Sequence, residues 1–109
     1  MRWMVFRYVA VAALVCGAQL SALAQPLEGN SLRGRDIATK LCSSCHRVLP
    51  MTVPDKADPP SFQSIANLPS TTGISLNVFL HSNHRNMPNL ILESADSDDV
   101  IAYILSLKQ

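Results

Sequence analysis

Apolar residues in this chain recur three and four positions apart, as on one face of a helix, and no run alternates apolar and polar residues over the length of a strand. The first such segment predicts a helix over residues 32–44, with Ser31 as its N-cap. Residues at this spacing are neighbours on a helix surface, so we expect the two cysteine sulfurs of the segment to share one face. That face consists of Ile37, Ala38, Leu41, Cys42 and Cys45.

Three more helices are predicted in the second half of the chain. Two of them are short and cover residues 62–66 and 75–82. Ser94 is expected to cap the last helix, where three aspartates within the next five residues favour the positive N-terminal end. The apolar positions of this last helix are Val100, Ile101, Tyr103, Ile104, Leu105 and Leu107.

Prolines separate the predicted helices. Five of the seven prolines crowd the middle of the chain, at positions 50, 54, 59, 60 and 69, and residues 49–60 are predicted to form a loop. The chain contains no internal repeat and no low-complexity segment. We therefore expect an all-α fold in which short helices are joined by proline-rich loops.

The N-terminus has the order of a secretory signal. Arg2 and Arg7 form a positive start, a short apolar run follows, and Ala22-Leu-Ala24 precedes a polar stretch. An uncleaved membrane anchor is the alternative, but the apolar run is short for a membrane span, which needs about 20 residues. We predict a signal peptide over residues 1–24, a mature domain over 25–109 and a periplasmic location.

Cleavage after Ala24 changes both the cysteine count and the charge. Cys16 is lost, and the mature chain keeps seven basic residues against eight acidic ones. A nearly neutral domain has no electrostatic footprint for nucleic acid, so nucleic-acid binding is not expected. Domains of this size often need a disulfide, a metal or a cofactor. The mature chain has only three aromatic residues, Phe62, Phe79 and Tyr103. This small number indicates that an apolar group other than protein fills the middle of the domain.

Residues 42–46 read C-S-S-C-H, the C-x-x-C-H signature of covalent haem attachment. Two thiols add across the two vinyl groups of one porphyrin, so they must lie a fixed short distance apart. The next residue then lies under the ring centre, where a histidine nitrogen can bind iron. The signature predicts one haem c held through Cys42 and Cys45, with His46 as the proximal iron ligand.

Other chemistries of this cysteine pair remain open at this stage. A Cys₂His₂ zinc module would take His81 and His84 as its further ligands, but their spacing is shorter than usual and His46 would have no role. A redox dithiol would want a βαβ setting, and no strand is predicted. A plain disulfide is the third alternative.

Haem iron in an electron carrier takes a second axial ligand, and methionine paired with histidine raises the potential. Met87 stands in N-M-P-N, where the following proline stiffens the chain. We predict Met87 as the distal ligand. His84, three residues away, is the principal rival, while Met51 lies too soon after His46 to reach the opposite face easily.

With these residues in view, the chain resembles the small class I c-type cytochromes, close to the single-haem periplasmic proteins of proteobacteria. The resemblance covers nearly all of residues 32–109. It rests on the C-x-x-C-H pentad, on a glycine eight residues before Cys42, and on three further stretches: D-P-P-S-F at 58–62, H-S-N-H-R-N-M-P-N-L at 81–90 and D-D-V-I-A-Y-I at 98–104.

The resemblance implies a cytochrome c fold wrapped around one haem. Gly34 would let the first helix cross closely over the last, against Tyr103. A proline carbonyl in the 58–62 stretch would accept a hydrogen bond from His46 and orient its ring. Two prolines are present, and Pro59 is the expected one, although Asp58 stands where a glycine is common.

The implied function is one-electron transfer between periplasmic or membrane redox partners, such as a dehydrogenase, an oxidase or a respiratory complex. The protein is expected to be a monomer that meets the membrane through those partners or an uncleaved anchor. With both axial positions filled, no enzymatic activity is expected. The alternative is a haem peroxidase or gas sensor in which Met87 dissociates from iron.

Overall fold

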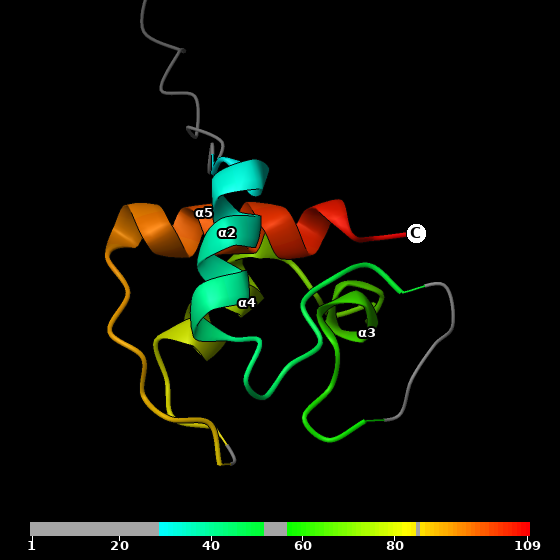
Figure 1. Cartoon of the computed structure of the whole chain (residues 1–109), viewed down its shortest axis with the longest axis horizontal. Coiled ribbons are helices and arrows are strands. Elements are labelled where there is room, and N and C mark those ends of the chain that lie inside the picture. The colour runs from blue at the N-terminus through cyan, green and yellow to red at the C-terminus, as the bar shows by residue number, and fades with distance from the viewer. Residues whose placement is uncertain (1–28, 52–56, 85) are drawn as a thin grey trace, which may run out of the picture.

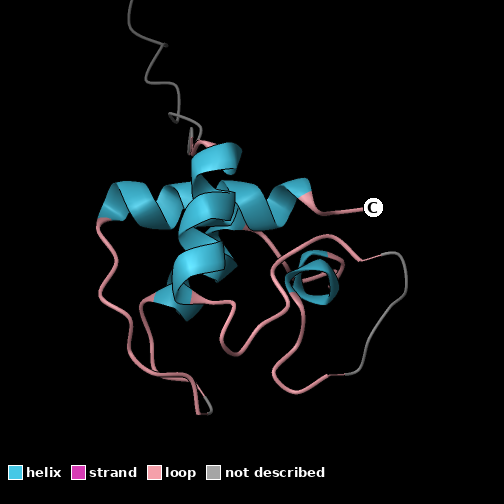
Figure 2. Ribbon diagram, in the orientation of Figure 1, coloured by secondary structure: helices cyan, strands magenta, loops and turns pink. Residues whose placement is uncertain are grey.

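The computed structural model describes residues 29–51, 57–84 and 86–109. These residues form four helices and no strand: α2 (Ser31–Leu41), α3 (Phe62–Ala66), α4 (Gly73–Leu80) and α5 (Ser94–Ser106). Figure 2 shows that loops of considerable length join the helices. The all-α prediction is confirmed for this part of the chain, whereas the predicted signal peptide lies outside it. None of the described helices combines the length and the apolarity that a membrane span requires.

Helices α2 and α5 cross at close range, with α2 lying over the middle of α5 in Figure 1. A Cβ atom added to Gly34 would stand 1.9 Å from the carbonyl oxygen of Asp99 and 3.0 Å from the Cβ of Tyr103. Gly29 meets α5 in the same way, 2.0 Å from the carbonyl oxygen of Asp98. A glycine is therefore required at both positions, since any side chain would push the two backbones apart. The expected crossing of Gly34 against Tyr103 is confirmed.

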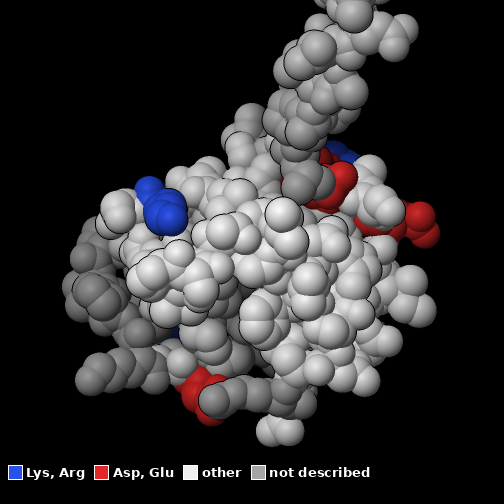
Figure 3. All heavy atoms as spheres, turned by 180° about the vertical axis from the view of Figure 1, so that it is seen from behind, with Lys and Arg blue, Asp and Glu red and all other residues white. Residues whose placement is uncertain are grey.

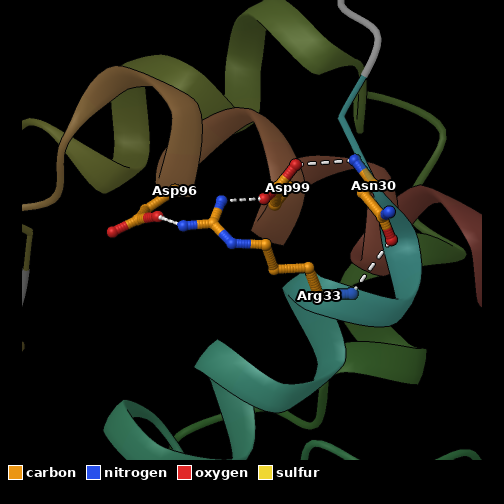
Figure 4. Close-up of polar contacts among 4 residues, drawn as sticks. All are labelled: Asn30, Arg33, Asp96 and Asp99. Atoms are coloured by element: carbon orange, nitrogen blue, oxygen red, sulfur yellow. Dashed lines mark hydrogen bonds and ion pairs between the residues drawn. The ribbon is translucent and has the colours of Figure 1, made fainter.

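A polar network fastens the same crossing at the start of α2 (Figure 4). The Asn30 backbone N–H donates to the Asp99 carboxylate at 2.6 Å, and the Asn30 side chain accepts from the Arg33 backbone N–H at 3.0 Å. The Arg33 guanidinium lies between the carboxylates of Asp96 and Asp99 and donates to both. The Asn30 hydrogen bond, together with the Arg33 cation, lowers the pKa of Asp99 below its ordinary value. The start of α2 is thus held to α5 by charge-assisted hydrogen bonds.

The helix boundaries differ from the predicted ones for local reasons. Asn30, not Ser31, caps α2, which ends at Leu41 instead of continuing to residue 44. A capping box between Thr72 and Ser75 starts α4 two residues earlier than predicted. Glu93, not Ser94, occupies the N-cap position of α5 and makes no side-chain capping bond.

The hydrophobic core lies where α2, α3 and α4 pack on α5. Val100, Ile101 and Ile104 supply the α5 side of it, as the spacing of the last helix predicts. Helix α5 contacts each of the other three described helices, and the segments that carry the candidate site connect these helices along the chain. The buried hydrophobic residues are Ala38, Cys42, Val48, Phe62, Ala66, Leu76, Val100, Ile101, Tyr103, Ile104 and Leu107.

Candidate cofactor site

The cysteine pair lies in the turn that follows α2. The backbone N–H groups of Cys45 and His46 both donate to the carbonyl of Cys42, at 3.2 and 2.8 Å. The prediction that both sulfurs lie on one helix face is therefore wrong, because α2 stops one residue before Cys42. The two thiols also differ in environment, since Cys42 is buried and Cys45 is exposed, and neither forms a disulfide. Burial raises the pKa of the Cys42 thiol.

The imidazole of His46 is held by a backbone carbonyl. Its Nδ1 lies 2.7 Å from the carbonyl oxygen of Pro60. Since the carbonyl can only accept, Nδ1 carries the proton, and Nε2 keeps the lone pair that a metal requires. A metal-bound histidine usually donates its other ring N–H to such an acceptor, which fixes the orientation of the ring.

This hydrogen bond corrects the expected role of Pro59. The acceptor is Pro60, the next residue along the chain. The physical reason is the alignment of the two segments: the Phe62 backbone N–H donates to the carbonyl of Arg47 at 2.9 Å. With residues 47 and 62 paired, the carbonyl two positions before Phe62 lies beside the ring of His46.

Aromatic side chains support the other side of this turn. The Phe62 ring lies 5.6 Å from that of His46 and 6.4 Å from that of Tyr103, tilted in both cases. The Tyr103 hydroxyl donates to the carbonyl of Val48 at 2.6 Å. Burial raises the pKa of Tyr103, so its hydroxyl remains a donor beyond the ordinary titration range of tyrosine. No sequence pattern predicts the role of Val48, because its contribution is a backbone carbonyl.

Met87 lies in the connection between α4 and α5. Its backbone N–H donates to the carbonyl of His84 at 3.2 Å, which closes a turn. Met87 is half-buried, whereas Asn86, Pro88 and Asn89 around it are exposed. In Figure 1 this connection and the turn after α2 extend on the same side of α5.

The two remaining histidines make hydrogen bonds of their own. Nδ1 of His84 lies 3.0 Å from the carbonyl oxygen of Ser82, and its ring meets the edge of Phe79 at 5.1 Å. His81 contacts the carbonyl of Asn77 through Nδ1 and the hydroxyl of Ser97 through Nε2. Within the described residues, no three His, Cys, Asp or Glu side chains converge as a metal site. The structure therefore does not assemble the zinc set of Cys42, Cys45, His81 and His84.

The residues present fit a covalently bound haem. Two free thiols and an imidazole with its Nδ1 already engaged form the donor set. Leu41, directly before Cys42, leaves 48% of its surface exposed in the protein chain alone, and Phe79 on α4 leaves 54% exposed. Large apolar side chains left to solvent offer a surface that a porphyrin would cover.

Comparisons with known proteins agree with this donor set. A family model described as Cytochrome c matches residues 31–108. The chain is 35% identical over 91 residues to Cytochrome c-552 of Bradyrhizobium diazoefficiens, an alignment that covers 84% of this chain and 88% of that protein. No solved structure matches the chain. The chain belongs to the cytochrome c family, and its haem is of the c type, bound covalently through Cys42 and Cys45.

Proposed function

We propose that this haem-based electron carrier ligates iron through His46 and Met87 and has no enzymatic activity of its own. The observation that carries the proposal is the hydrogen bond between His46 Nδ1 and the Pro60 carbonyl. It leaves one imidazole nitrogen unprotonated, four residues after Cys42, the first of the two thiols. When bound, the haem supplies an iron that gains or loses one electron.

The residues of the chain have distinct parts in this function. The Pro60 carbonyl fixes the tautomer and the direction of His46, and Phe62 packs against its ring. The Tyr103 hydroxyl anchors the segment that follows His46 to α5. Because the ring of His46 and the segment after it are both held in place, we expect His46 to move little when the charge on the metal changes.

Met87 is supported as the distal ligand by its surroundings. Its side chain is less exposed than those of the three residues around it, Asn86, Pro88 and Asn89. His84 is the competing donor, but its Nδ1 bonds to Ser82 and its ring packs against Phe79. These contacts give His84 a structural role that does not need iron.

The partners are proposed to be redox proteins, such as a dehydrogenase, an oxidase or a respiratory complex, met by a monomer exported to the periplasm after removal of residues 1–24. Residues 59–92 include a single formally charged side chain, at position 85. On the face seen in Figure 3, the few basic and acidic residues lie around a broad uncharged area. This distribution favours partner recognition through apolar and neutral contacts over long-range electrostatic steering.

Optical spectra of the holoprotein test the axial ligands. The ferric wild type should show a weak long-wavelength band from sulfur-to-iron charge transfer, which Met87→Ala abolishes and the matched control His84→Ala retains. A bis-imidazole spectrum that Met87→Ala leaves unchanged would assign the ligand to His84. Rapid carbon monoxide binding by the ferrous wild type at neutral pH would instead favour the peroxidase or gas-sensor alternative.

A further inference from the structure

The segment that carries Met87 leaves α4 and returns to α5, and its two ends are joined by a hydrogen bond. His81 is the C-cap residue of α4, and Ser97 lies in the first turns of α5, 16 positions along the chain. The Ser97 hydroxyl lies 3.2 Å from Nε2 of His81. The connection between α4 and α5 is therefore a loop that is closed at its base by two side chains.

The hydrogen bonds of His81 fix the direction of its ring. Nδ1 lies 2.9 Å from the carbonyl oxygen of Asn77, so the proton is on Nδ1. Nε2 is then an acceptor, and the Ser97 hydroxyl donates to it. Ser97 itself is 1% exposed, whereas His81 is exposed, so the bond has a buried donor and an acceptor that lies at the surface.

Other hydrogen bonds of the loop organise its α4 end. Ser82 donates to the carbonyl of Val78, and His84 lies against Ser82 and Phe79. These partners all belong to α4 or to the residues directly after it. The contact of His81 with Ser97 differs from them because it crosses from α4 to α5.

We propose that His81 and Ser97 are positioning residues that hold the loop closed at its base and thereby keep Met87 on the haem iron. The inference rests on the proposed ligation by Met87. Joining the ends of a loop reduces the number of conformations open to the residues between them. Loss of the bond makes dissociation of Met87 easier without removing any atom of the ligand.

Displacement of Met87 by imidazole measures this effect in the ferric holoprotein. The sulfur-to-iron band reports the fraction of Met87 still bound while imidazole is titrated at fixed neutral pH. The variants are Ser97→Ala, His81→Ala and the double substitution. The matched control is Ser106→Ala, which removes another α5 hydroxyl, one that donates to the carbonyl of Tyr103 at 2.6 Å at the far end of the helix.

Each single variant should lower the dissociation constant of imidazole about two- to tenfold, the factor that corresponds to the net contribution of one hydrogen bond. The double variant should add little to either single one, because both remove the same interaction. Ser106→Ala should leave the constant unchanged. His81 is exposed, so His81→Ala provides the measurement even if Ser97→Ala does not fold.

Two results overturn the inference in distinguishable ways. If the wild type lacks the sulfur-to-iron band, the ligation by Met87 fails and the inference fails with it. If the band is present and imidazole binds the variants as it binds the wild type, the ligation stands and only the positioning role is refuted. Fully additive effects of the two single variants also refute a shared hydrogen bond.

Discussion

The crossing of α2 over α5 makes Gly34→Ala the sharpest test of the fold, because two physical effects predict opposite signs. Alanine in a helix is more favourable than glycine by about 1 kcal/mol, so helix propensity alone predicts a more stable protein. The contact predicts the reverse. The new Cβ would stand 1.9 Å from the Asp99 carbonyl oxygen and 2.4 Å from its carbon.

The size of the effect follows from these distances. Ordinary contact begins near 3.4 Å, so the two backbones must separate by about 1.5 Å at the crossing. Overpacking of this kind costs about 1–3 kcal/mol, and the backbone atom at Asp99 cannot turn aside as a side chain would, which places Gly34→Ala at or above the upper end. After the gain in propensity, we expect the free energy of unfolding to fall by about 2 kcal/mol.

Urea unfolding of the holoprotein, followed by far-ultraviolet circular dichroism, measures this change. Leu32→Ala on the same helix is the matched control, because Leu32 is 75% exposed and its loss should change stability by less than about 0.5 kcal/mol. A Gly34→Ala protein as stable as the wild type, or more stable, would refute the close crossing.

Two further predictions concern the polar contacts of α5. Tyr103→Phe removes the donor to the Val48 carbonyl, and we expect a loss of about 1–2 kcal/mol in urea unfolding, since the carbonyl is left buried without its partner; an unchanged midpoint would contradict this. The lowered pKa of Asp99 means that its carboxylate stabilises the folded state above the ordinary aspartate pKa of about 3.9, and that this stabilisation disappears as the pH falls through the lower folded-state value. Asp99→Asn should therefore lower the free energy of unfolding by about 1–2 kcal/mol at neutral pH and by less near pH 3. If the variant differs from the wild type by the same amount at both pH values, the charge-assisted contacts of Asp99 with Asn30 and Arg33 are refuted.

The helical class and the identity of the donor groups could be predicted from the sequence because both depend on neighbouring residues. Apolar spacing located the four helices of the described residues to within a few positions. The pentad at 42–46 placed two thiols and an imidazole together, whatever the remaining chain does. The role of Gly34 was predicted through the resemblance to the class I c-type cytochromes, which have a glycine eight residues before the pentad, and the close backbone contact explains why that position needs a glycine.

The helix ends were predicted less well, because capping depends on which of several adjacent polar side chains turns back toward the backbone. Asn30 and Ser31 are both good N-cap residues, and the additional hydrogen bond from Asn30 to Asp99 accompanies the choice of Asn30. The end of α2 at Leu41 separated the environments of Cys42 and Cys45, which no spacing rule predicts.

The sequence by itself determined the chemistry of this protein: two thiols, an imidazole, candidate distal ligands and a set of short helices. Only the tertiary structure decided that Pro60 instead of Pro59 orients His46, that Tyr103 anchors Val48, and that Ser97 bonds to His81. The reason is physical. Two of these acceptors are backbone carbonyls, which every residue carries alike, and the contacts join residues 14, 55 and 16 positions apart, so the folded chain alone selects the partners.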